Sequence, residues 1–90
     1  MDVHHDTQAQ EFSVEVGGHR AELQYRLRDG VMTIVHTGVP EEIGGRGVAA
    51  ALTRVALETA RANGWKVVPA CAYAEAFMRR HREYADLLSS

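Results

Sequence analysis

The segment that decides the fold is residues 41–50, which read Glu-Glu-Ile-Gly-Gly-Arg-Gly-Val-Ala-Ala. Three glycines in four positions are unfavourable in the middle of a helix. At a helix start they suit a bound ligand, because no Cβ atoms separate it from the backbone. The first amides of a helix also lack partners, and the helix dipole makes that end partly positive. The glycines alone leave two interpretations equal: an anion-binding helix start, or a flexible loop in which glycine relieves crowding.

The residues before this segment predict β-strands. Residues 11–16 and 20–28 alternate apolar and polar side chains, which is typical of half-buried strands. The pairs Gly17-Gly18 and Asp29-Gly30 are typical of two-residue hairpin turns. Residues 31–39 are apolar at both odd and even positions, so we expect a central strand that is covered on both faces and ends at Pro40.

The residues after the segment predict a helix, a strand and a second helix. The first helix ends at Asn63-Gly64, the strand spans residues 65–70, and the last helix begins near Ala72. The face of the first helix that we expect to be buried carries Val48, Leu52, Val55 and Thr59.

A strand, a helix and a second strand imply a parallel pair with a right-handed crossover. We therefore predict a mixed α+β fold, with an antiparallel three-stranded meander, a βαβ crossover and a C-terminal helix. It forms a single domain over residues 11–90, preceded by a flexible N-terminus of residues 1–10, which show no apolar periodicity.

The position of the glycine segment favours anion binding. It follows the carboxyl end of a central strand and opens a parallel crossover, where open α/β sheets bind ligands. Arg46 can add a charge-assisted hydrogen bond to the anion. The motifs of nucleotide hydrolysis and of dinucleotide binding are absent from the segment.

Composition narrows the class of partner. The formal net charge of −2 lacks the basic excess of nucleic-acid-binding proteins. No run approaches the about 20 apolar residues that span a bilayer, so we expect a cytoplasmic protein without a membrane partner. The histidines have no metal-ligand spacing, so we expect no metal. We also expect a monomer or a weak homodimer.

Several motifs resemble a known family. Val39-Pro40 and residues 45–52 resemble the acetyl-CoA motif of the GNAT acetyltransferase superfamily. Residues 36–87 more narrowly resemble its small stand-alone N-acetyltransferases, with matching residues in the glycine segment, in residues 60–71 and in residues 80–87. The resemblance implies a minimal GNAT-like fold, acetyl-CoA as co-substrate and an unidentified amine as acceptor.

The resemblance also implies where the coenzyme lies. The pyrophosphate would sit on the backbone amides of residues 45–49. The pantetheine arm would lie beside the third strand, in a splay between it and the following strand. The residues implied for coenzyme binding are Val39, Gly44, Gly45, Arg46, Gly47, Val48, Ala49, Cys71 and Tyr73.

The chain departs from the pattern of the family at Gly38, Gly44 and Arg82, the last of which stands where the small family usually has proline. Gly38 stands where the small family typically has glutamate, which removes a candidate base. Gly44 stands where arginine or glutamine is usual, which removes one side-chain contact. Met78 falls near the position of a tyrosine that serves as general acid in larger members.

Two residues are candidates for catalysis. Cys71 ends the last strand, where a thiol could accept the acetyl group or form a disulfide with the coenzyme; the thiolate is the reactive form, and helix starts favour it. The alternative for Cys71 is a small buried hydrophobe. His36, two residues before an expected strand bulge, would lie near the thioester; its alternative is a hydrogen-bonded core or rim residue.

The sequence therefore predicts an N-acetyltransferase that moves the acetyl group of acetyl-CoA to an amine. Attack on a thioester requires a base or proton path and donors for the developing oxyanion. One alternative is a non-catalytic acyl-CoA-binding or sensing module, which the short chain favours because no segment remains for a helical acceptor-binding region. Another is an interaction module that keeps a vestigial site.

Overall fold

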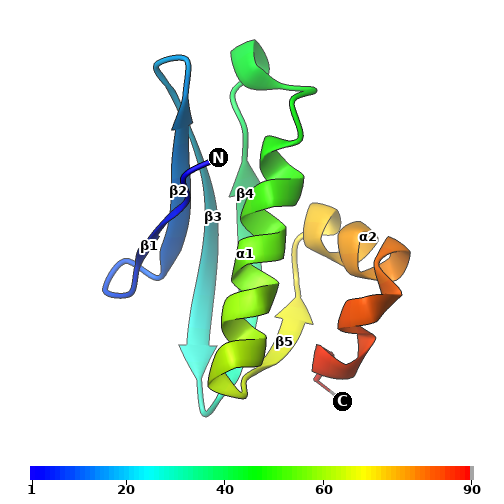
Figure 1. Ribbon diagram of the computed structural model, residues 1–90. Coiled ribbons are helices and arrows are strands. Elements are labelled where there is room, and N and C mark those ends of the chain that lie inside the picture. The colour runs from blue at the N-terminus through cyan, green and yellow to red at the C-terminus, as the bar shows by residue number, and fades with distance from the viewer. Residues whose placement is uncertain (90) are drawn as a thin grey trace.

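The sheet has five strands in the order β1-β2-β3-β4-β5, with the α-helices on one face (Figure 1). This computed structural model describes residues 1–89. The strands are β1 (His4–Asp6), β2 (Glu11–Val16), β3 (His19–Arg28), β4 (Val31–Gly38) and β5 (Lys66–Pro69). The helices are η1 (Glu41–Ile43), α1 (Val48–Asn63), α2 (Ala72–Arg80) and η2 (Arg82–Leu87), of which η1 and η2 are 3₁₀-helices. The predicted α+β fold is confirmed.

The two hairpin predictions are confirmed. Val16 pairs directly with His19 across Gly17-Gly18, and both glycines have positive φ, as such a tight turn requires. The second turn, at Asp29-Gly30, also has positive φ at both positions. These turns set the register in which one face of β2 and β3 is buried along most of its length, through Phe12, Val14, Ala21, Leu23 and Tyr25.

Strand β4 is central, but only one of its faces is covered. It pairs with β3 in antiparallel and with β5 in parallel orientation, as expected. Met32 and Ile34 are fully buried beneath the helices, whereas Val35 is 39% exposed. The prediction of two covered faces was wrong, because every helix packs on the same side. We call the uncovered side of the sheet the outer face.

A bulge in β4 changes which side chains face outward. Gln24 pairs with His36 while Tyr25 pairs with Ile34, so Val35 is the extra residue. The sequence had placed the bulge two residues after His36, which was wrong. Because successive side chains of a strand alternate, Thr37 faces the helices with its partner Leu23, and His36 faces outward with Gln24.

Helix α1 covers the inner face of the sheet with a stripe that matches the prediction at Val48 and Leu52 but not at Val55 and Thr59. Its buried residues are Val48, Leu52, Thr53, Ala56, Leu57 and Ala60. Val55 is 36% exposed and Thr59 is half-buried, so their assignment to the buried face was wrong. The many alanines gave the pattern little contrast, and the small Ala56 and Ala60 face the sheet, where they allow close packing. The helix ends at Gly64 in the left-handed conformation, as predicted.

The C-terminal residues run beside β5. Helix α2 and η2 pack next to α1 (Figure 1). Leu88 then forms a single parallel bridge with Val67, and the Ser89 amide donates to the Val67 carbonyl at 2.9 Å. Among residues 1–89, no helix has the length and apolarity to cross a membrane.

Strand β1 lies in the segment predicted to be flexible. Its pairing with β2 was not foreseen, because the segment has no apolar alternation. The His5 ring stacks on Phe12 with centroids 4.0 Å apart, and its Nε2 lies 2.7 Å from the Tyr25 hydroxyl. The His5 imidazole and the pairing with β2 thus hold this strand against the sheet. The flexibility of residues 1–10 stays a prediction.

The attachment of β1 should weaken in acid. Burial lowers the pKa of His5 below its ordinary value of 6.5, with a smaller opposing effect of Asp6. The folded state therefore favours the neutral ring, and this stabilisation is present above pH 6.5 and is lost as the pH falls through the lower, folded value. The protection of the amides of residues 4–6 against hydrogen exchange, relative to the intrinsic rate at each pH, should fall over that range. His5→Phe, which cannot titrate, should flatten the dependence and His4→Phe should preserve it; equal profiles in all three proteins would contradict this.

Candidate functional site

The glycine segment forms an open turn before α1. Gly45 and Gly47 have φ of 78° and 75°, the left-handed region that favours glycine. A Cβ atom built on either residue meets nothing within 4 Å. The space beside both backbones is therefore free, and a ligand can approach them closely.

The first turn of α1 presents unpaired amides to that space. Its first backbone bond runs from the Ala51 amide to the Gly47 carbonyl at 3.0 Å, and Gly47 has no side chain with which to cap the helix. The amides of residues 48–50 have no acceptor among the described residues. Three donors at the positive end of a 16-residue helix form a site for an anion.

A cavity of about 270 Å³ adjoins this helix start. It unites seven of the nine residues predicted to bind coenzyme; the exceptions are Arg46, whose side chain is exposed beside the loop, and Cys71. Its lining also includes Ile43 and Ala50, which the sequence analysis did not single out. The full lining is Val39, Ile43, Gly44, Gly45, Gly47, Val48, Ala49, Ala50 and Tyr73.

Strands β4 and β5 part next to this cavity. Their pairing ends at Ile34 and Pro69. The Ile34 carbonyl then accepts two amides, from Ala70 at 2.9 Å and from Cys71 at 3.1 Å, as the chain turns into α2. Beyond this point β4 continues through the bulge at Val35 to three residues, His36, Thr37 and Gly38, which pair only with β3. One edge of β4 is therefore free of a strand partner, which is the splay that the resemblance implies.

Cys71 lies where the two strands part. It is the N-cap of α2, and its Sγ accepts a hydrogen bond from the Ala74 amide at 3.4 Å. The same sulfur lies 3.6 Å from Oγ1 of Thr37, on the helix side of β4. The half-buried thiol is thus held by one amide and one hydroxyl.

His36 lies on the outer face instead. Its side chain is 53% exposed, and its Nε2 is 3.8 Å from Oε1 of Glu22. The two catalytic candidates, His36 and Cys71, are therefore on opposite faces of the sheet. The structure does not bring them together, because the bulge at Val35 turns His36 away from the helices.

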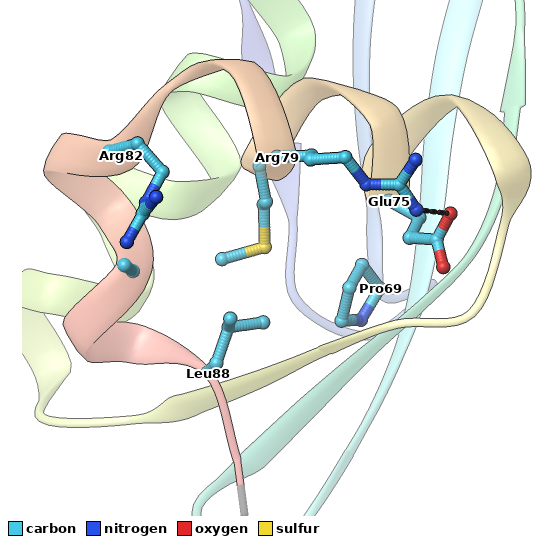
Figure 2. A pocket seen from close by; sticks show the side chains of 7 residues that line it. Pro69, Glu75, Arg79, Arg82 and Leu88 are labelled. Atoms are coloured by element: carbon cyan, nitrogen blue, oxygen red, sulfur yellow. Dashed lines mark hydrogen bonds and ion pairs between the residues drawn. The ribbon is translucent and has the colours of Figure 1, made fainter.

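A second cavity, larger than the one beside the glycine segment, is bordered by β5, α2 and η2 (Figure 2). It has a volume of about 450 Å³, and Arg79 at its rim is paired with Glu75 at 2.9 Å. Its lining includes Met78, so this residue does not face the glycine segment. No sequence pattern marks this cavity, because its residues are scattered over β5, α2, η2 and the residue after η2: Pro69, Glu75, Met78, Arg79, Arg82, Ala85 and Leu88.

Metal chemistry has no evident ligand set in this part of the chain. Over residues 1–89, no three histidine, cysteine, aspartate or glutamate side chains gather closely enough to hold a metal ion.

Comparison with known proteins identifies the class. The family model of GCN5-related N-acetyltransferases matches residues 11–87, so the chain belongs to this family. It is thus an N-acetyltransferase by family, and the family generally uses acetyl-CoA as co-substrate. The chain is similar to the NMR solution structure of a GCN5-like candidate N-acetyltransferase from Staphylococcus aureus, with 28% identity, a TM-score of 0.78, and coverage of 99% of this chain and 88% of that one.

The cap at Cys71 provides a test of the local geometry. Cys71→Ala removes the acceptor for the Ala74 amide and should lower the free energy of unfolding by about 1 kcal/mol. Cys71→Ser keeps an acceptor at the N-cap and should recover most of that loss. Chemical denaturation of the three proteins measures both effects. Equal stability of the alanine and serine variants would show that the cysteine side chain does not cap α2.

Proposed function

We propose that the chain transfers the acetyl group of acetyl-CoA to a primary amine. The observation that carries this proposal is the open glycine turn before α1, with three unpaired amides, directly beside the parted strands β4 and β5. When bound, acetyl-CoA supplies a thioester as acyl donor. The residues described above would bind it, orient it and manage the proton that the amine loses.

The helix start fits a pyrophosphate. Gly45 and Gly47 leave open space beside the backbone. The unpaired amides of residues 48–50 lie at the N-terminus of α1, which the helix dipole makes partly positive. Arg46 is exposed beside this loop and is free to add a charge-assisted bond. The open space is the supporting observation, since a Cβ atom would occupy the position that the phosphates need.

The neighbouring cavity and splay fit an extended, partly apolar arm. Val39 and Tyr73 supply apolar surface to the lining of the cavity. The free edge of β4 offers backbone donors and acceptors to an arm that contains amide groups, as a missing strand would. Cys71 lies at the apex of the splay, so we assign it to the thiol end of the site.

The glycine turn can be tested with a matched pair of variants. Gly47 and Gly64 begin and end the same helix with nearly equal φ, 75° and 72°, and neither has an atom within 4 Å of an added Cβ. Alanine should strain the backbone at both, at a cost of about 1 to 2 kcal/mol. Only Gly47→Ala should weaken coenzyme A binding, by about tenfold or 1.4 kcal/mol.

Calorimetric titration with coenzyme A and thermal unfolding measure these two quantities separately. An unchanged affinity for coenzyme A in folded Gly47→Ala would contradict the assignment of the coenzyme to this turn. An equal loss of affinity in Gly64→Ala would contradict it as well. Turnover of acetyl-CoA with a panel of amines then separates an enzyme from an acyl-CoA-binding module, which would bind without turnover.

The position of Cys71 predicts contact with the coenzyme sulfur. Coenzyme A disulfide should form a mixed disulfide with wild-type protein and not with Cys71→Ala, as intact mass spectrometry would detect. Retained acetylation of amines by Cys71→Ser would show direct transfer to the amine. If only the wild type gives an acetyl adduct and Cys71→Ser acetylates no amine, the thiol carries the acetyl group.

A further inference from the structure

The outer face of the sheet carries a second polar cluster at the open end of β4. Gly38 pairs directly with Glu22, and His36 pairs with Gln24, so all four residues share that face. No helix covers them, and the stretch of β4 that holds His36 and Gly38 is the one that β5 leaves unpaired. The cluster therefore borders the splay from the side opposite Cys71.

Gly38 makes room for this cluster. A Cβ atom at residue 38 would lie 2.9 Å from Nε2 of His36 and 3.2 Å from Oε1 of Glu22. The His36 imidazole and the Glu22 carboxylate thus lie over the backbone of Gly38. The distance between Nε2 of His36 and Oε1 of Glu22 is 3.8 Å. Any other residue at this position would displace one of the two groups.

The charge of Glu22 is available to a ligand. Arg20, two positions away on the same face, is paired with Glu11. Arg26 donates to the Tyr25 carbonyl at 3.2 Å. Among the described residues, the only ion-pair contact of the Glu22 carboxylate is His36, and its side chain is 25% exposed.

We propose that Glu22 and His36 form the acceptor subsite for a primary alkylamine, an inference that rests on the proposed function. The Glu22 carboxylate binds the ammonium form of the acceptor. A nitrogen–hydrogen bond of the ammonium then breaks, the proton passes to a ring nitrogen of His36, and the nitrogen keeps the electron pair as a neutral amine. Glu22 also compensates the positive charge that His36 gains. The acceptor approaches the splay from the outer face, and the coenzyme site lies on the helix face.

Binding of an amine can be tested without the coenzyme. In an NMR titration of the protein with butylamine, the ring signals of His36 should shift, and those of His19 should not. Glu22→Gln should weaken this binding about tenfold, since it removes the charge-assisted bond. Glu15→Gln makes the same change elsewhere on the outer face and should bind like wild type. Gly38→Ala should also weaken binding while the fold is kept, because the added Cβ meets only the ends of movable side chains.

Kinetics separate the two roles. Glu22→Gln should raise KM for the amine about tenfold with little change in kcat. His36→Gln should lower kcat about a hundredfold at neutral pH. That deficit should shrink as the pH approaches the pKa of the alkylamine, about 10.4, because the acceptor then arrives neutral. A purely structural role of His36 would give a deficit that is independent of pH.

The outcomes also separate this inference from the proposed function. Coenzyme-dependent amine acetylation that is unimpaired in Glu22→Gln and His36→Gln would overturn the acceptor subsite alone. A His36 signal that butylamine leaves unmoved would overturn it as well. Specific butylamine binding that requires Glu22, in a protein that acetylates no amine, would support the subsite and contradict the acetyltransferase activity.

Discussion

The structure depends on a single backbone carbonyl, that of Ile34, which ends the parallel pairing of β4 and β5. It accepts the amides of both Ala70 and Cys71, so the chain leaves the sheet there and enters α2. The free edge of β4 and the position of the thiol follow from this early exit. Strand β4 extends past its neighbour, one of its edges is free, and the thiol of Cys71 lies at the point of separation. The glycine turn and α1 then close the same end of the sheet.

Turns and termini were predictable, because glycine marks them locally. The hairpin at Gly17-Gly18, the start of α1 at Gly47 and its end at Gly64 all require positive φ, which few other residues adopt. The buried stripe of α1 was not predictable in detail. Alanines occupy both faces of that helix, so the periodicity could not distinguish Val55 from Leu57.

The open glycine turn before α1 could be predicted from the sequence and the polar cluster could not. The loop is contiguous, and its amides need only a helix start. The cluster depends on strand register, since Glu22 meets His36 across two strands and through the bulge at Val35. No local signal marks that bulge, which reverses the face of His36. In the sequence, Gly38 indicates only the loss of a glutamate side chain. In the structure it leaves space for the side chains of His36 and Glu22.

The short bridge between Leu88 and Val67 has a consequence for self-association. An uncovered strand edge invites pairing with another chain, and short edge strands reduce that risk. Here one border of the sheet is the three-residue β1, and the other is a four-residue strand that the C-terminal tail partly screens. Neither border offers a long template for intermolecular β-pairing. Pairing of strands between copies of this chain is therefore disfavoured, which lowers the risk of fibrillar assembly.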